Sequence, residues 1–263
     1  MSATMGESTV FLRTTRLPVL TIILALTLAA CGSGPKLEIP TPGEHRYTSL
    51  EPLAIHAVSV EEFIITGSLT RTDGTPEGLI LTTHTGGRTW RRLAAEVHDL
   101  KRTTFQAVFF SDRLRGWVGG VRVDAQGRAR PVVFRTDDAG NHWSAVTLIQ
   151  DPEAMVSEVH SLAFTSDRQG SVTVTLRDPA TRETRETTFM TDDAGRSWTV
   201  GAYREKPTVP FRDQTSSMVD RERGFRLRKS QYPGVTLVEA TISEGRDWMP
   251  VSELSIGALA TYY

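Results

Sequence analysis

An eight-residue motif occurs twice almost unchanged in this chain, as Thr-Asp-Asp-Ala-Gly-Asn-His-Trp ending at Trp143 and as Thr-Asp-Asp-Ala-Gly-Arg-Ser-Trp ending at Trp198. Weaker copies end at Trp90 and Trp248, so these tryptophans recur about every 50 residues. A period of this length is typical of proteins built from stacked copies of one supersecondary unit. The sequence therefore predicts an array of similar units.

A second turn signal recurs in phase with the first. An Asp-Arg pair begins at Asp112, Asp167 and Asp220, each about 30 residues before the tryptophan that ends the next motif. Asp can accept hydrogen bonds from its own turn, and the glycine that follows each pair permits a positive φ. Two turn signals with one period indicate that every unit has the same order of strands and turns.

Alternating apolar residues between these turns indicate four strands in each unit. We expect first strands at residues 54–60, 105–110, 159–164 and 216–219, and second strands at 63–70, 116–123, 171–176 and 224–229. Third strands are expected at 78–83, 131–136, 187–191 and 235–241, and each fourth strand begins at the tryptophan. Four strands in about 50 residues match one propeller blade, so we expect an all-β protein, a β-propeller of about four four-stranded blades.

The motif has a physical role at the turn between third and fourth strands. Its central carboxylate can accept bonds from backbone N–H groups of the loop, its glycine can take a conformation closed to other residues, and its tryptophan buries a large ring. We assign this structural role to Thr136, Asp138, Gly140, Trp143, Thr191, Asp193, Gly195 and Trp198, and to Gly87, Trp90, Gly245 and Trp248 of the weaker copies.

The motif is similar to the Asp-box, or bacterial neuraminidase repeat. With Gly-Trp-Val-Gly-Gly at residues 116–120, the longer pattern resembles the photosystem II stability and assembly factor family. That resemblance covers about residues 50–250 and implies an extracytoplasmic propeller that acts as an assembly scaffold. Thr85 and Ser243 stand where the Asp-box has its carboxylate, so we expect looser turns there.

The number of units leaves the closure of the propeller open. Four units are fewer than that family usually has. A closed four-bladed ring, a fifth incomplete blade and an open array completed by a second copy are the alternatives. Residues 36–47 and 256–263 are the segments that could pair with the outer blades. An open array leaves sheet edges exposed, which proteins usually avoid.

The first residues resemble a bacterial lipoprotein signal. Arg13 and Arg16 precede a short apolar run that ends in Leu-Ala-Ala-Cys at Cys31, the only cysteine of the chain. We expect a signal peptide at 1–30, a lipid on Cys31, a flexible tether at 31–46 and the propeller at 47–263, with repeats at about 50–100, 101–150, 155–203 and 212–252. The alternative is a buried cysteine inside an ordinary anchor helix.

The net charge and the spacing of the histidines argue against nucleic acid and metal ions as ligands. The formal net charge is −1, which argues against a nucleic-acid partner. None of the six histidines shows metal-ligand spacing, so we expect no metal and no cofactor. In the Asp137-Asp138 pair we expect one side chain to hold the turn and the other to face solvent.

One basic cluster is a candidate surface for an anionic protein partner. Arg226 and Arg228 alternate with Phe225 and Leu227, so the strand should bury the apolar pair and present both arginines together. The candidate partner-binding residues are Arg223, Arg226, Arg228, Lys229, Arg122 and Arg130. A solvated face of mixed charge is the alternative, since acidic residues lie among them.

The Asp-box also invites comparison with sialidases, whose chemistry needs a tyrosine nucleophile, an assisting carboxylate, an acid/base Asp and an arginine cluster. The five tyrosines lie near the tether, in loops or at the tail, as Tyr47, Tyr203, Tyr232, Tyr262 and Tyr263. We therefore expect no catalysis. The interpretation is a lipid-anchored extracytoplasmic scaffold that binds a protein of a membrane complex; the alternative is a cell-surface carbohydrate-binding protein or sialidase-like glycosidase.

Overall fold

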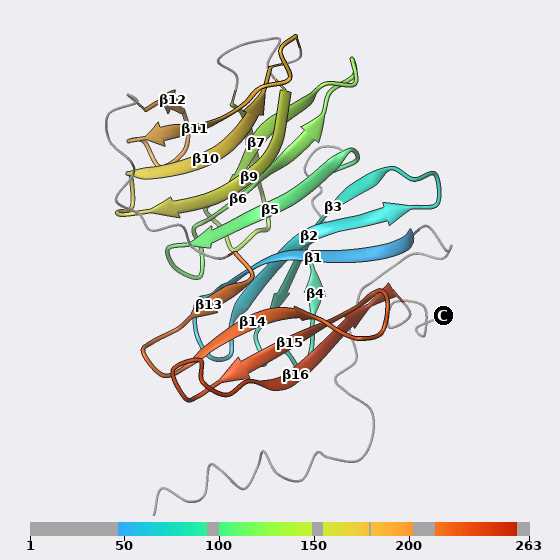
Figure 1. The fold of residues 1–263 in the computed structure, drawn as a ribbon. Coiled ribbons are helices and arrows are strands. Elements are labelled where there is room, and N and C mark those ends of the chain that lie inside the picture. Colours follow the sequence, from blue (N-terminus) through green and yellow to red (C-terminus); the bar gives the residue numbers. More distant parts are fainter. Residues whose placement is uncertain (1–46, 94–99, 149–154, 179, 202–213, 257–263) are drawn as a thin grey trace, which may run out of the picture. The chain divides into compact units, whose positions relative to one another are not determined.

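A computed structural model of the chain describes residues 47–93, 100–148, 155–178, 180–201 and 214–256 (Figure 1). Residues 1–46, with the expected signal peptide, Cys31 and tether, lie outside these ranges. All elements within them are β-strands. The described residues form no helix long and apolar enough to cross a membrane.

The strands form four antiparallel four-stranded sheets, each with its strands in chain order. Blade 1 comprises β1 (Tyr47–Ala57), β2 (Phe63–Arg71), β3 (Pro76–Thr83) and β4 (Arg91–Arg92). Blade 2 comprises β5 (Thr103–Phe110), β6 (Gly116–Val123), β7 (Ala129–Thr136) and β8 (Ser144–Thr147). Blade 3 comprises β9 (Met155–Phe164), β10 (Gly170–Arg177), β11 (Thr184–Thr191) and β12 (Thr199–Val200), and blade 4 comprises β13 (Ser216–Met218), β14 (Gly224–Lys229), β15 (Val235–Thr241) and β16 (Met249–Ser255). The fold class is thus confirmed: the protein is all-β, with the blades of a β-propeller.

The largest difference from the expected strands lies in blade 1. Its first strand begins at Tyr47, seven residues before the expected start at Ala54. Register shifts at Tyr47/Ser49 and at Pro52/Ala54 interrupt the two-residue alternation, so the apolar pattern is readable only after the second shift. As a consequence Tyr47 pairs with Arg71 of β2.

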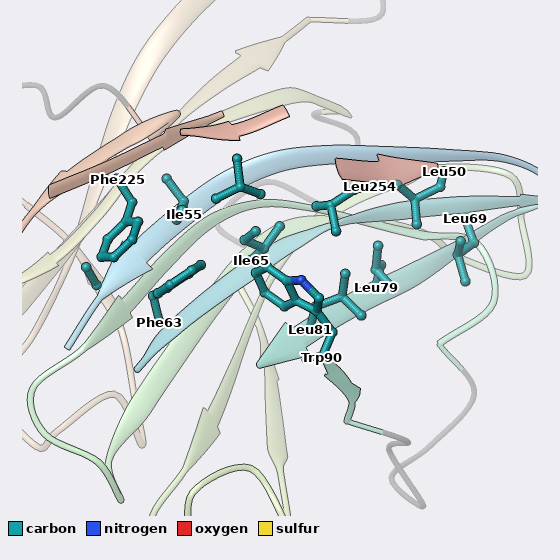
Figure 2. Packing of buried hydrophobic residues seen from close by; sticks show 12 residues of the cluster. Leu50, Ile55, Phe63, Ile65, Leu69, Leu79, Leu81, Trp90, Phe225 and Leu254 are labelled. Atoms are coloured by element: carbon teal, nitrogen blue, oxygen red, sulfur yellow. The ribbon is translucent and has the colours of Figure 1, made fainter. Parts of the chain in front are cut away.

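Three apolar cores join the blades in the order 4, 1, 2, 3. Between blades 4 and 1, Phe225 stacks on Phe63 with ring centroids 4.2 Å apart, and Leu254 packs over Ile65 and its neighbours (Figure 2). A second core lies between blades 1 and 2, and a third between blades 2 and 3. Each core is built from strand faces of two different blades, so burial of apolar surface holds neighbouring blades together.

The face of blade 3 that points away from blade 2 is polar. Val172, Val174 and Phe189 of blade 3 are buried against blade 2, whereas Thr173 and Thr188 lie on the opposite face and share a hydrogen bond of 3.1 Å. In the described part of the chain, no element of blade 3 packs closely on blade 4. Which of the three alternatives for closure the chain adopts therefore stays a prediction.

Candidate active site

The repeated motif forms a hydrogen-bonded turn after the third strand. In blade 2, Asp138 Oδ1 accepts from Thr136 Oγ1 at 2.9 Å and from the His142 backbone N–H at 2.8 Å. Thr136 Oγ1 in turn accepts from the Gly140 N–H at 2.9 Å, and Gly140 has φ +82°. The hydrogen bonds from His142, backbone first and then side chain, lower the pKa of Asp138 to about 2.

Blade 3 repeats this turn with the same partners. Asp193 Oδ1 accepts from Thr191 Oγ1 at 2.8 Å and from the Ser197 N–H at 2.9 Å, while Oδ2 accepts from Ser197 Oγ at 2.6 Å. The Ser197 side chain, followed by its backbone N–H, lowers the pKa of Asp193. Gly195 has φ +80°. Both carboxylates therefore accept hydrogen bonds from residues of their own turn.

In the weaker copies a hydroxyl stands in place of the carboxylate. Thr85 Oγ1 accepts from the Thr89 N–H at 2.8 Å, and Ser243 Oγ accepts from the Asp247 N–H at 2.9 Å. The same backbone contact is therefore made by a neutral acceptor, which forms a weaker hydrogen bond than a carboxylate. Whether these turns are looser stays a prediction.

The tryptophans of the motif differ in their surroundings. Trp90 and Trp143 are buried, and Trp198 and Trp248 are half-buried. Trp90 Nε1 donates to Ser252 of blade 4 at 3.0 Å. A Cβ on Gly87 would lie 3.6 Å from Ser252 and Val251 of blade 4, whereas a Cβ on Gly245 would meet only Trp248 of its own turn. The first motif thus packs against a neighbouring blade, and the fourth packs mainly on itself.

A cluster of four polar side chains lies at the other end of blade 1, and we name it the Tyr47 cluster. The Tyr47 hydroxyl donates to Glu77 Oε1 at 2.7 Å. Arg71 Nη1 donates to Glu77 Oε2 at 2.8 Å, and Arg92 donates to Glu77 Oε1 at 2.6 Å and to the Tyr47 hydroxyl at 3.2 Å. The three charged side chains are between 14% and 23% exposed, so the cluster is half-buried and still reaches the surface.

Burial and hydrogen bonding set the ionisation of this cluster. Burial raises the pKa of Tyr47, and its hydrogen bond to Glu77 raises it further against the opposing effect of Arg92. Burial also raises the pKa of Glu77, but the hydrogen bonds from Tyr47, Arg71 and Arg92 outweigh burial and leave that pKa below its usual value. At neutral pH the pair is therefore a neutral phenol that donates to a carboxylate.

The sequence did not reveal this cluster because its members come from four different strands. The β2–β3 hairpin brings Glu77 beside the end of β2, and the register of β1 brings Tyr47 opposite Arg71. Tyr47 was expected near the tether and before the first strand, because two register shifts hide the start of that strand. The sequence signal that could have revealed the cluster is a tyrosine just before the expected first strand, followed by a hairpin with Arg and Glu on its two sides.

A surface depression of about 570 Å³ adjoins the cluster where blades 1 and 2 meet. It is lined by four cationic side chains and two carboxylates: Arg71, Lys101, Arg102 and Arg122, with Asp73 and Asp124. Arg71 belongs to both sites, since its guanidinium also binds Glu77. Arg71 is therefore the one lining residue that the depression shares with the Tyr47 cluster.

The expected partner-binding arginines of blade 4 are on one strand face and are paired within the blade. Arg226 Nε and Arg228 Nε each donate to the buried Glu239 carboxylate at 2.7 Å, and Phe225 lies in the core on the other face. These hydrogen bonds outweigh the effect of burial and leave the pKa of Glu239 below its usual value. Much of the positive charge on this face is thus neutralised locally.

The other expected partner-binding residues are spread over separate places. Arg223 pairs with Asp220 at 2.5 Å, and Lys229 Nζ lies 3.8 Å from Glu51. Arg122 lines the depression, and Arg130 is buried with its Nε 3.4 Å from Asp124. A protein-binding role for these residues stays a prediction.

Comparisons with known proteins show likeness of fold. No family model and no curated protein matches the chain. The chain is similar to the Hadza microbial sialidase Hz136, with 14% identity and a TM-score of 0.44 over 76% of this chain and 45% of that one. It is similar to the Trypanosoma rangeli sialidase solved with the inhibitor DANA, with 12% identity and a TM-score of 0.41 over 83% of this chain and 41% of that one. The chain spans less than half the length of either sialidase.

A third similar structure is Zg3597, a family 117 glycoside hydrolase from the marine bacterium Zobellia galactanivorans. Identity is 11% and the TM-score is 0.39, over 84% of this chain and 74% of that one. Likenesses this distant bear on the fold and place no residue of the site.

The expectation of a non-catalytic protein is wrong. It was argued on the ground that no tyrosine would meet a carboxylate on converging strands, yet Tyr47 of β1 donates to Glu77 of β3 between two arginines. The three structures to which the chain is similar are two sialidases and a glycoside hydrolase. Tyr232 lies exposed in a hairpin, and Tyr203, Tyr262 and Tyr263 lie outside the described residues.

Proposed function

We propose that the protein is a glycosidase that acts on sugars with a carboxylate at the anomeric carbon, the class to which sialic acids belong. The observation that carries the proposal is the 2.7 Å hydrogen bond from the Tyr47 hydroxyl to Glu77, with Arg71 and Arg92 on the same carboxylate. A carboxylate nucleophile would be repelled by the carboxylate of such a sugar. A neutral phenol assisted by a nearby base avoids that repulsion.

The chemistry follows from the ionisation of the pair. Glu77 accepts the phenolic proton as Tyr47 Oη attacks the anomeric carbon, and the bond to the leaving oxygen breaks with its electron pair. Water then attacks the same carbon and releases one proton to solvent, and Glu77 returns its proton to the departing Tyr47 oxygen. The leaving oxygen takes up a proton from solvent, or departs as a phenolate when it is an aryl oxygen. Each guanidinium has five N–H donors, more than the cluster uses, so Arg71 and Arg92 can also hold the sugar carboxylate.

The test uses an aryl leaving group, which departs as a phenolate and needs no acid. We expect the purified protein to release 4-methylumbelliferone from its α-N-acetylneuraminide and Tyr47→Phe to lose at least about 100-fold in kcat. Tyr232→Phe, at an exposed tyrosine of the β14–β15 hairpin, is the matched control and should keep wild-type kcat. The proposal would be refuted if the wild type showed no turnover, or if Tyr47→Phe turned over the substrate as fast as the wild type.

For the location we propose that a lipid on Cys31 holds the protein on the outer side of a bacterial membrane. Support comes from the apolar run before Cys31 and from the Gly-Ser-Gly-Pro segment after it, which suits a flexible tether. An anchored glycosidase of this kind would act on glycans in the cell envelope or outside the cell.

A further inference from the structure

The three junctions between blades follow one rule. Each blade has a rear face, which carries the tryptophan of its repeated motif, and a forward face on the opposite side. Trp90, Trp143 and Trp198 pack in the cores between blades 4 and 1, 1 and 2, and 2 and 3, so every junction joins the forward face of one blade to the rear face of the next. Among the described elements, none packs closely on the forward face of blade 3 or on the rear face of blade 4.

The rear face of blade 4 is charged where the other rear faces are apolar. Its register pairs Arg226 of β14 with Glu239 of β15. Glu239 is buried and accepts from Arg226 Nε and Arg228 Nε at 2.7 Å each, and the Arg226 guanidinium carbon also lies 4.5 Å from the Trp248 ring centroid. Both guanidinium groups are therefore held in place on β14, while Glu253 lies on the outermost strand of this face. The equivalent pairs of the other blades are apolar and buried in the cores: Ile65 with Leu81, Val118 with Phe134, and Val172 with Phe189.

The forward face of blade 3 is polar where the other forward faces are apolar. In its register, Thr175 of β10 lies between Glu158 of β9 and Glu186 of β11, so both carboxylates belong to this face. Both are exposed, and Arg177 stands at the end of β10 on the same face. Thr188 of this face stands where the other blades have apolar residues of the cores: Ile80, Val133 and Val238.

The junction between blades 1 and 2 shows which of these residues would meet. A Cβ on Gly78 of blade 1 would lie 2.6 Å from Phe105 of blade 2, and Phe105 pairs with Gly120. Glu186 occupies the register position of Gly78 in blade 3, and Arg228 occupies that of Gly120 in blade 4. A junction of the same kind between these two faces therefore brings a carboxylate beside a guanidinium group.

We propose that the forward face of blade 3 binds the rear face of blade 4 of a second copy, and that two copies of four blades each close one ring of eight blades. Each copy has one unpaired face of each kind, so head-to-tail association completes two identical junctions. Glu158 and Glu186 of one copy then face Arg226 and Arg228 of the other, and complementary charges of this kind select the partner and fix its register. This dimer forms whether or not the Tyr47 cluster is catalytic.

The first test measures the mass of the purified full-length chain by light scattering over a range of concentrations, with Cys31→Ser to exclude effects of the lipid and the thiol. We expect the mass of two chains at high concentration and dissociation on dilution, because both faces are polar. Glu186→Arg places a cation against Arg228 of the other copy and should weaken the dimer at least about tenfold. Glu183→Arg, the same change at an exposed position of the neighbouring hairpin, is the matched control and should leave the dimer intact.

The second test identifies the junction. Glu186→Cys and Arg228→Cys are introduced together in the Cys31→Ser chain, and the protein is oxidised. We expect a disulfide-linked dimer on a non-reducing gel. A monomer with an internal disulfide would mean that one chain closes its own ring, and folded protein without a disulfide would mean that both faces are solvated ends. Either result would overturn the proposal.

The mass measurement can overturn it independently. A mass of one chain at every concentration, a mass above two chains, or a dimer that Glu186→Arg leaves unchanged would each do so. Glu186 is exposed, so its substitution tests the junction even where loss of the Arg228 contact to Glu239 impairs folding of the cysteine variant.

Discussion

Replacing Glu77 by glutamine removes one charge from the Tyr47 cluster and keeps its size. The wild-type carboxylate accepts from Tyr47 Oη, Arg71 Nη1 and Arg92 Nη2 at 2.7, 2.8 and 2.6 Å. Hydrogen bonds to charged groups contribute about 1.5–3 kcal/mol each, and loss of a fully buried partner costs about 3–5 kcal/mol. Since Glu77 is 15% exposed and both arginines reach solvent, we expect Glu77→Gln to lower the free energy of unfolding by about 2–3 kcal/mol at pH 7.

The pH dependence of this loss identifies its cause. The folded-state pKa of Glu77 lies below its usual value, so the carboxylate stabilises the fold above the unfolded-state pKa, and this contribution disappears as the pH falls through the folded-state pKa. Urea unfolding of wild type and Glu77→Gln from pH 7 downward should therefore show two stabilities that converge in acid. Glu183→Gln, at an exposed hairpin position, should track the wild type throughout.

Two results would refute this reasoning. A difference that stays constant from pH 7 into acid would mean that shape, and not charge, holds the cluster together. A difference under about 0.5 kcal/mol at pH 7 would mean that water replaces the three hydrogen bonds without loss. In either case the cluster would not be the pre-organised charge arrangement on which the proposed chemistry depends.

Three further predictions concern the motif and the anchor. Gly140→Ala should lower the unfolding free energy by about 2–3 kcal/mol, because a Cβ there would lie 2.5 Å from Leu93 Cδ1 at a φ of +82°. Urea unfolding measures this loss, and a loss below about 0.5 kcal/mol would contradict the prediction. Thr85→Asp should raise the unfolding free energy by about 0.5–1 kcal/mol, because a carboxylate would replace the hydroxyl that now accepts the hydrogen bond from the Thr89 N–H. Unchanged or reduced stability in the same assay would contradict this. Cys31→Ala should release the protein from the membrane fraction into the soluble fraction when cells are fractionated, and retention of the variant in the membrane would argue against lipid anchoring.

Much of the blade plan could be predicted from the sequence because it depends on local interactions. The hydrogen bonds among Thr136, Asp138 and His142 lie within one short turn, and the residue types that make them stand together in the chain. The strand bounds of β6, β14 and β15 agree with the expected ranges, since alternation and turn residues mark them. The alternation at Phe225 and Arg226 likewise predicted which side chain enters the core.

The tertiary structure decided the candidate site and the charge distribution. Tyr47, Arg71, Glu77 and Arg92 meet because two register shifts in β1 and the β2–β3 hairpin bring residues of four strands together, and no local pattern reports such shifts. The expected basic face of blade 4 is partly neutralised by Glu239 on the neighbouring strand, which the sequence of β14 alone does not contain.

The arrangement of the blades likewise depends partly on local sequence and partly on tertiary packing. Repeated motifs determine that each unit forms a similar blade, because each motif satisfies its own backbone. Which blade faces pack together depends on apolar surface contributed by strands far apart in sequence, such as Phe63 against Phe225. Hydrogen bonds within a turn join residues that are neighbours in the sequence, so the sequence pattern predicts them. Packing between blades and the pairing of charges depend on distances that only the folded chain establishes.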